Sequence, residues 1–107
     1  MSKYMINLLQ EPNQELTCNC QDDSGNTFAV DLKLRTLPDN NLCIDITVDG
    51  EVQRLSAICT NDMPLLPNNI LNGNLYFDDI YGTDDPNYEE FNDRFRLIYD
   101  TEFRFGE

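Results

Sequence analysis

The chain has 107 residues, of which 40% are hydrophobic and 10% aromatic, and twenty acids against seven bases give a net charge of −13. This length suits one domain with its own core, and the composition is that of a folded chain rather than a disordered acidic one. The charge excludes a basic nucleic-acid footprint and predicts repulsion from anionic membranes. No apolar run approaches the roughly 20 residues of a membrane span, and the first residues do not resemble a signal peptide. We therefore expect a protein that is made in a cytoplasm and stays soluble there.

Two short strands are predicted before the main pattern, over residues 4–9 and 15–20. Turn-forming residues end both of them, at residues 10–13 and 21–26. Because side chains alternate on a strand, Cys18 and Cys20 share one face of the second strand with Leu16.

Residues 28–60 carry the strongest strand signal, three alternating segments joined by turn residues, which predicts a β-meander. Asp49-Gly50 is typical of a type I′ hairpin turn. A two-residue loop there would place Asp45 opposite Arg54 and Ile44 opposite Leu55. The side chains that we expect in one core are Phe28, Val30, Leu32, Leu34, Leu42, Ile44, Ile46 and Leu55, together with Leu97 and Tyr99.

The regular pattern stops after Thr60, where Pro64 and Pro67 bracket Leu65 and Leu66. Proline lacks the amide donor, so this stretch cannot pair as a strand. At least one of the two leucines is expected to anchor the core or an interface, because both would otherwise expose apolar surface. Residues 75–80 form the next predicted strand.

Residues 78–93 contain seven acids and no base, which predicts a hydrated acidic surface that faces solvent or a channel. Asp84 or Asp85 is expected to cap a short helical turn with Pro86 at its first position. Tyr88 and Phe91 would share one side of that turn. Clustered carboxylates also suit calcium, but the D-x-D-x-D-G order is missing, so we expect no stoichiometric calcium.

Alternation returns over residues 95–105, which is longer than the common strand of about 5–6 residues. We expect residues 96–99 to close the sheet and a break at Asp100-Thr101. Residues 101–106 would then form an arm that adds a strand to a neighbouring subunit. The alternative is that this tail folds back as one more strand of its own barrel.

The residues that support chemistry are few. Four cysteines without any histidine or C-x-x-C pair do not suit zinc, and free buried thiols are expected, with Cys43 the most reactive. The usual base of a nucleophilic triad is absent. Paired carboxylates leave a glycosidase-type pair open by residue type alone, but adjacent acids on a strand or loop commonly point apart. We predict no enzyme activity, no cofactor, no metal, no small-molecule substrate and no membrane or direct nucleic-acid contact.

The predicted fold is a small all-β barrel or sandwich of about six to seven mostly antiparallel strands, with at most one short helical turn near residues 85–91. We expect residues 1–107 to form a single domain, with a core of about residues 6–99 and a C-terminal strand or arm over 100–107.

A series of short motifs follows one another along most of the chain. They are Asn7-Leu8-Leu9, Pro12-Asn13-Gln14, Leu34-Arg35-Thr36-Leu37, Asp45-Ile46-Thr47-Val48-Asp49-Gly50-Glu51, Met63-Pro64-Leu65-Leu66-Pro67, Gly73-Asn74-Leu75-Tyr76-Phe77, Asp85-Pro86 through Phe91, and Arg96-Leu97-Ile98-Tyr99. In order and spacing the chain resembles the small baseplate plug proteins of contractile-tailed bacteriophages, of the kind found in cyanophages. The resemblance implies a non-enzymatic virion protein of the tail baseplate, assembled in the host bacterial cytoplasm and bound to tail-tube, hub and spike proteins and to copies of itself. The candidate interface residues are Leu65, Leu66, Tyr88, Phe91, Phe103 and Phe105.

Two other functions remain open from the sequence. A small acidic inhibitor could mimic DNA, but it would need carboxylates spaced like phosphates, and here the acids concentrate in one loop. A ligand-binding β-barrel is the third possibility.

Overall fold

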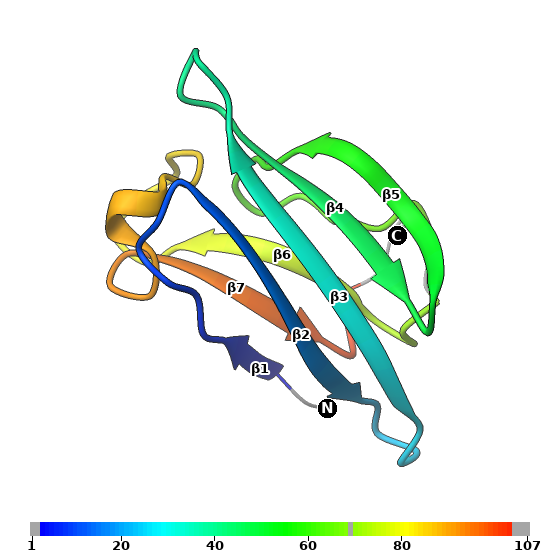
Figure 1. Cartoon of the computed structure of the whole chain (residues 1–107). Helices are drawn as coiled ribbons and strands as arrows, with labels where there is room; N and C mark the ends of the chain where they lie inside the picture. Colours follow the sequence, from blue (N-terminus) through cyan, green and yellow to red (C-terminus); the bar gives the residue numbers. More distant parts are fainter. Residues whose placement is uncertain (1–2, 69, 104–107) are drawn as a thin grey trace.

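A computed structural model describes residues 3–68 and 70–103, which fold into two antiparallel sheets (Figure 1). The larger sheet has the strand order β2-β3-β4-β5 and the smaller one β1-β7-β6. The strands are β1 (Lys3–Ile6), β2 (Asn13–Gln21), β3 (Thr27–Thr36), β4 (Leu42–Val48), β5 (Glu51–Ile58), β6 (Asn74–Asp79) and β7 (Phe95–Asp100), and the 3₁₀ turn η1 covers Tyr88–Glu90. No helix among the described residues is long and apolar enough to cross a membrane.

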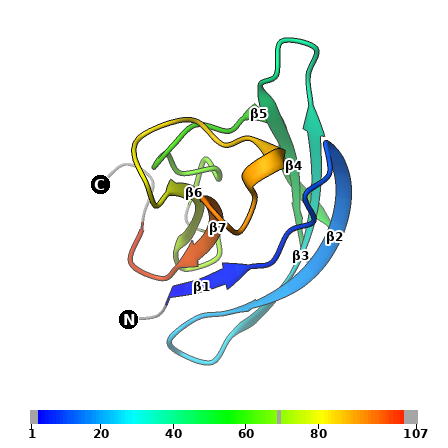
Figure 2. The ribbon, with the colours of Figure 1, turned by 90° about the vertical axis from the view of Figure 1, so that its left-hand side faces the viewer.

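The larger sheet curves around the smaller one, and the core fills the space between them (Figure 2). The all-β prediction is confirmed, but the two sheets are not closed into a barrel. Each sheet presents one apolar face to the other, as the alternating patterns of the strands require. The largest fully buried side chains are Tyr99, Phe77, Phe91, Leu32, Leu34, Leu42, Ile44, Ile46, Leu66, Leu71, Leu75 and Leu97.

The predicted meander is confirmed, because β3, β4 and β5 pair in sequence order. Asp49 and Gly50 have φ values of 50° and 83° and form the two-residue loop between Val48 and Glu51. The predicted partner of Ile44 is wrong, since Ala57 rather than Leu55 lies opposite it. Leu55 is 68% exposed and is not part of the core.

Two β-bulges in β5 cause this difference. They add residues to β5 alone, so that Arg54 lies opposite Ile46 and not opposite Asp45. The Asp45 carboxylate instead accepts hydrogen bonds from the Ser56 amide at 2.6 Å and from Arg35 Nη2 at 3.1 Å. Ser56 has a φ of 52°, and Asp45 thus stabilises the bulge that turns Leu55 outward.

The proline-bounded segment is held inside the protein by Asn74, whose side chain is fully buried. Asn74 Oδ1 accepts from the Leu66 amide at 3.0 Å, and Nδ2 donates to the Leu66 carbonyl at 3.1 Å. These bonds replace the strand pairing that proline prevents, and Leu65 and Leu66 are both buried. The prediction of a core anchor is confirmed.

The first and last strands, β1 and β7, differ in length from the strands that the sequence predicts. The first strand ends at Ile6, because the next buried residue, Leu8, donates its amide to the side chain of Asn92 at 3.1 Å rather than to a strand. The last strand covers Phe95–Asp100 rather than the predicted 96–99, and the predicted break falls one residue later, where Thr101 and Glu102 form a turn.

The helical turn η1 is capped by Asn87, whose Oδ1 accepts from the Glu89 amide at 2.9 Å. The predicted cap at Asp84 or Asp85 is wrong. Both carboxylates bind elsewhere, Asp84 to Arg94 and Asp85 to the Asn61 amide.

Replacing Ile44 with Ala should lower the free energy of unfolding by ~2–5 kcal/mol, because Ile44 is fully buried. Leu55→Ala is the matched control, since Leu55 is exposed, and it should change stability by less than about 0.5 kcal/mol. Urea denaturation of both variants checks this expectation. Equal losses for the two variants would contradict the core assignment.

Candidate interaction surfaces

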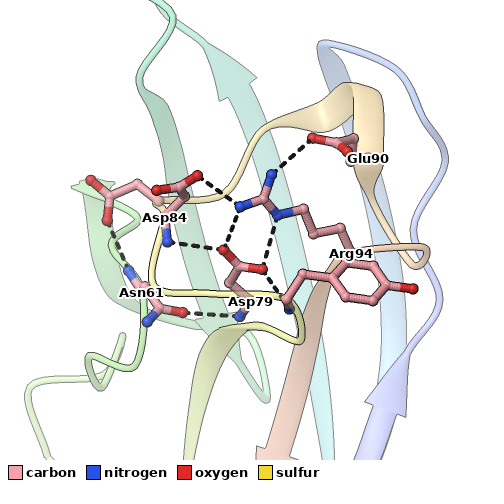
Figure 3. A network of polar contacts seen from close by, with 7 residues as sticks. Asn61, Asp79, Asp84, Glu90 and Arg94 are labelled. Carbon is pink, nitrogen blue, oxygen red and sulfur yellow. Dashed lines mark hydrogen bonds and ion pairs between the residues drawn. The ribbon is translucent and has the colours of Figure 1, made fainter.

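Asp79 and Arg94 form a two-pronged ion pair at the base of the acidic loop that joins β6 to β7 (Figure 3). Arg94 Nε and Nη2 each donate to one carboxylate oxygen of Asp79 at 2.9 Å. The strand register positions the pair, because Asp79 lies opposite Phe95, the next residue after Arg94. The ion pair therefore joins the two ends of the acidic loop.

The Asp79 side chain is fully buried and accepts two more hydrogen bonds, from the amides of Tyr81 and Asp84 at 2.9 Å each. The Arg94 hydrogen bonds, and after them the two amides, hold the pKa of the Asp79 carboxyl well below its usual range, although burial opposes this shift. Asp79 in turn raises the pKa of Arg94. The prediction of a hydrated acidic surface is therefore wrong for Asp79. Its partner lies one residue beyond the acidic run, so the run alone did not reveal it.

Two exposed acids of the loop, Asp84 and Glu90, contact the same guanidinium group. Arg94 Nη2 lies 2.7 Å from Asp84 Oδ2, and Nη1 lies 3.7 Å from Glu90 Oε2. Asn61 joins this network from the segment after β5, because its Oδ1 accepts from the Asp79 amide at 2.9 Å. Arg94 thus contacts three of the seven acids of residues 78–93, and this segment keeps a large negative charge.

Asp79→Asn should destabilise the protein at pH 7, because Arg94 would lose its charged partner. A depressed folded-state pKa contributes stability that is present above the ordinary Asp pKa of about 4 and is lost as the pH falls below that value. The difference between wild type and Asp79→Asn should therefore shrink between pH 7 and pH 3 in urea denaturation. The exposed Glu89→Gln is the control and should show little change at either pH. A pH-independent difference for Asp79→Asn would contradict the ion-pair assignment.

The candidate interface residues fall into two groups. Leu65, Leu66 and Phe91 are 3%, 0% and 0% exposed within the protein's own core, so they offer no surface to a partner. Tyr88 packs half-buried against that core, and the ring of Phe103 contacts that of Tyr76, with centroids 4.3 Å apart and planes tilted by 31°. Phe105 lies outside the described residues. An interface role for Tyr88, Phe103 and Phe105 stays a prediction.

All four cysteines are free thiols, and three of them are buried. The prediction that Cys43 is the most reactive is wrong, because Cys43 is only 2% exposed. It lies near the start of the interior strand β4, alongside Cys59, whose pKa burial raises strongly. Cys18 is the most exposed of the four, and its hydrogen bond with Cys20 lowers its pKa.

An exposed apolar row lies on the outer face of β5. We call Val52, Leu55 and Ile58 the β5 stripe, and they are 61%, 68% and 47% exposed. The sequence analysis missed this surface because it assigned Leu55 to the core. The available signal was that polar Glu51 and Gln53 occupy positions with the core parity, which is typical of a strand with broken alternation.

Residues 3–68 and 70–103 contain no group of three or more His, Cys, Asp or Glu side chains arranged to hold a metal ion. The prediction about calcium is tested by calorimetry, which should show no micromolar binding isotherm. Asp84 already binds Arg94, so calcium would have to displace that contact. A micromolar isotherm that Asp84→Asn abolishes would contradict the expectation.

The fold and these surfaces define a small acidic all-β module with an apolar strand edge and a charged loop. A comparison with known protein families matches residues 3–102 to the family described as cyanophage baseplate Pam3 plug gp18. The chain therefore belongs to this family of phage baseplate plug proteins. A search of the curated proteins found no match.

This membership confirms the resemblance to baseplate plug proteins and indicates a structural protein of the virion tail. Such a protein assembles with other baseplate components.

Proposed function

We propose that the protein is the central plug of a phage baseplate, bound between the tail tube and the hub-spike complex, and that it performs no chemical step. The observation that carries this proposal is the family match over residues 3–102 of a chain that presents an apolar stripe and a separate acidic loop. A component that joins two protein assemblies needs contact surfaces of this kind more than it needs a cavity with reactive groups.

The β5 stripe is the proposed contact with a tube or hub protein. Three large aliphatic side chains in water favour burial against a partner, at roughly 25 cal/mol per Å² of apolar area. The bulges of β5 disturb the backbone hydrogen-bonding edge, so a partner contacts the side chains rather than extending the sheet.

The acidic loop is the proposed channel-facing or solvent-facing surface. Exposed carboxylates repel the phosphates of DNA, so a negative surface lets DNA pass without binding. The Asp79–Arg94 pair keeps this loop folded against β6 and β7 despite the repulsion among its acids.

A DNA-mimic inhibitor is a weaker alternative. Asp79 is buried and paired, and Asp84 and Glu90 gather around one arginine, so these carboxylates do not form an extended row like a phosphate backbone.

The variant Leu55→Asp tests the proposal, because it places a charge on the β5 stripe without touching the core. We expect wild-type stability but at least a tenfold loss of incorporation into baseplates assembled with the tube and hub proteins of the same phage, measured by quantitative immunoblotting of purified particles. Asn19→Asp, an exposed change on β2, is the matched control and should incorporate normally. Normal incorporation of Leu55→Asp would exclude the stripe as the contact.

A further inference from the structure

Two thiols lie side by side on the core-facing side of β2. Cys18 and Cys20 are separated by one residue, Asn19, so both side chains point to the same face of the strand. Cys18 is half-buried, and Cys20 is 3% exposed. β2 is an edge strand of the larger sheet and pairs with β3. The two sulfurs therefore lie at the edge of a sheet.

A groove between β1 and β2 gives access to this pair. It has a volume of about 540 Å³, and both cysteines line it together with Tyr4, Ile6 and Tyr99. Cys18 packs against the core from its margin, whereas Cys20 belongs to the core itself. A small molecule that enters the groove therefore meets the sulfur of Cys18 before that of Cys20.

The two sulfurs are in hydrogen-bond contact, and this contact gives them different acidities. The Cys20 thiol donates to the Cys18 sulfur and lowers the pKa of Cys18, although burial and the negative charge of Asp31 oppose this shift. The same hydrogen bond, and after it burial, raises the pKa of Cys20. Cys18 therefore loses its proton first, and the thiolate is the nucleophilic form of cysteine.

The spacing of the pair allows a disulfide if β2 bends. Two residues of a strand span about 6.7 Å, which is close to the upper limit of about 6.8 Å between the Cα atoms of a disulfide. The larger sheet curves around the core, so side chains on its inner face converge (Figure 2). An edge strand bends further at Asn19 at the loss of hydrogen bonds to one neighbour, β3.

The other two cysteines provide an internal comparison. Cys43 and Cys59 are each 2% exposed and are not among the described residues that line the groove. Burial strongly raises the pKa of Cys59. A reagent that attacks thiolates should therefore discriminate between the two pairs.

We propose that Cys18 and Cys20 form a reversible disulfide that bends β2 at Asn19, with Cys18 as the attacking thiol and Cys20 as the resolving thiol. The oxidant is a low-molecular-weight disulfide, RSSR. The Cys18 thiolate attacks one sulfur of RSSR, which forms a mixed disulfide and releases RS⁻. Cys20 then loses its proton and attacks the Cys18 sulfur, which releases the second RS⁻. The two protons lost by the cysteines convert both RS⁻ groups to RSH, so two thiols are oxidised and one RSSR is reduced.

The bond links oxidation to the shape of the sheet edge. A bend at Asn19 disturbs the regular backbone edge of β2, and a disturbed edge pairs less readily with another strand. Strain at the bend makes the bond easy to reduce. This inference concerns the isolated protein and does not depend on a role in the baseplate.

The first experiment is mass spectrometry of the full chain after incubation with oxidised glutathione. The protein should lose the mass of two hydrogen atoms and retain no glutathione, and dithiothreitol should restore the original mass. N-ethylmaleimide added to the unfolded oxidised protein should label Cys43 and Cys59 but neither Cys18 nor Cys20. Labelling of all four cysteines, or a bond between Cys43 and Cys59, would overturn the proposal.

The second experiment separates the roles of the two thiols. Cys20→Ser should accumulate the mixed disulfide with one glutathione, because no thiol resolves it. Cys18→Ser should react at least about tenfold more slowly, because Cys20 is buried and its pKa is raised. Cys43→Ser is the matched control and should form the bond as the wild type does. Cys20→Ala replaces Cys20→Ser if that variant fails to fold, and equal reaction rates for the Cys18 and Cys20 variants would overturn the assignment.

The third experiment tests the bend by amide hydrogen exchange. The amides of residues 18–21 should exchange at least about tenfold faster in the oxidised protein than in the reduced one, because pairing with β3 is disturbed. The amides of β4 are the control and should exchange at the same rate in both states. Unchanged exchange in β2 of a fully oxidised protein would overturn the proposed bend.

Discussion

The ion pair between Asp79 and Arg94 is the contact on which the acidic half of the protein depends. The seven acids of residues 78–93 repel one another, and the half-buried guanidinium of Arg94, which donates two hydrogen bonds to the buried Asp79 carboxylate, joins the two ends of the loop. The pair sits where the two strands of the smaller sheet begin and end, so it stabilises the sheet and the loop together. Asn61 extends the network to the segment after β5, which connects the larger sheet to the same point.

A second constraint is that the sheets share a core but no strand. The larger sheet supplies residues such as Leu32 and Ile46, and the smaller one supplies Phe77 and Tyr99, so packing between side chains holds the layers together. Irregular segments complete the core where strands cannot. The clearest case is Asn74, which satisfies the backbone of Leu66 and allows two leucines outside any strand to be buried. Gly73 beside it leaves room for the end of β7, since a Cβ there would collide with the Asp100 carbonyl oxygen.

Strand positions and the meander could be predicted from the sequence because alternation and the Asp49-Gly50 turn are local signals. The bulges in β5 could not, because they depend on how Asp45 and Arg35 reach Ser56 across two neighbouring strands. The same limit applies to the acidic loop. Residue composition indicated charge, but the burial of Asp79 follows from the register between β6 and β7, which brings Arg94 beside it. Parity also misplaced Cys43, which is 2% exposed although it shares the outward parity of Asp45 and Thr47, because Arg35 and Ile58 flank it on the neighbouring strands.

The charge of the acidic loop makes the ionic strength of the medium part of the protein's behaviour. Fixed carboxylates on neighbouring molecules repel over a Debye length, which is about 10 Å at 0.1 M salt and about 30 Å at 0.01 M. In dilute buffer this repulsion extends across much of a molecule whose dimensions are 38 × 28 × 24 Å. Apolar contacts such as the β5 stripe have no such dependence. The balance between the two forces therefore shifts with dissolved ions, and added salt favours contact between like-charged copies.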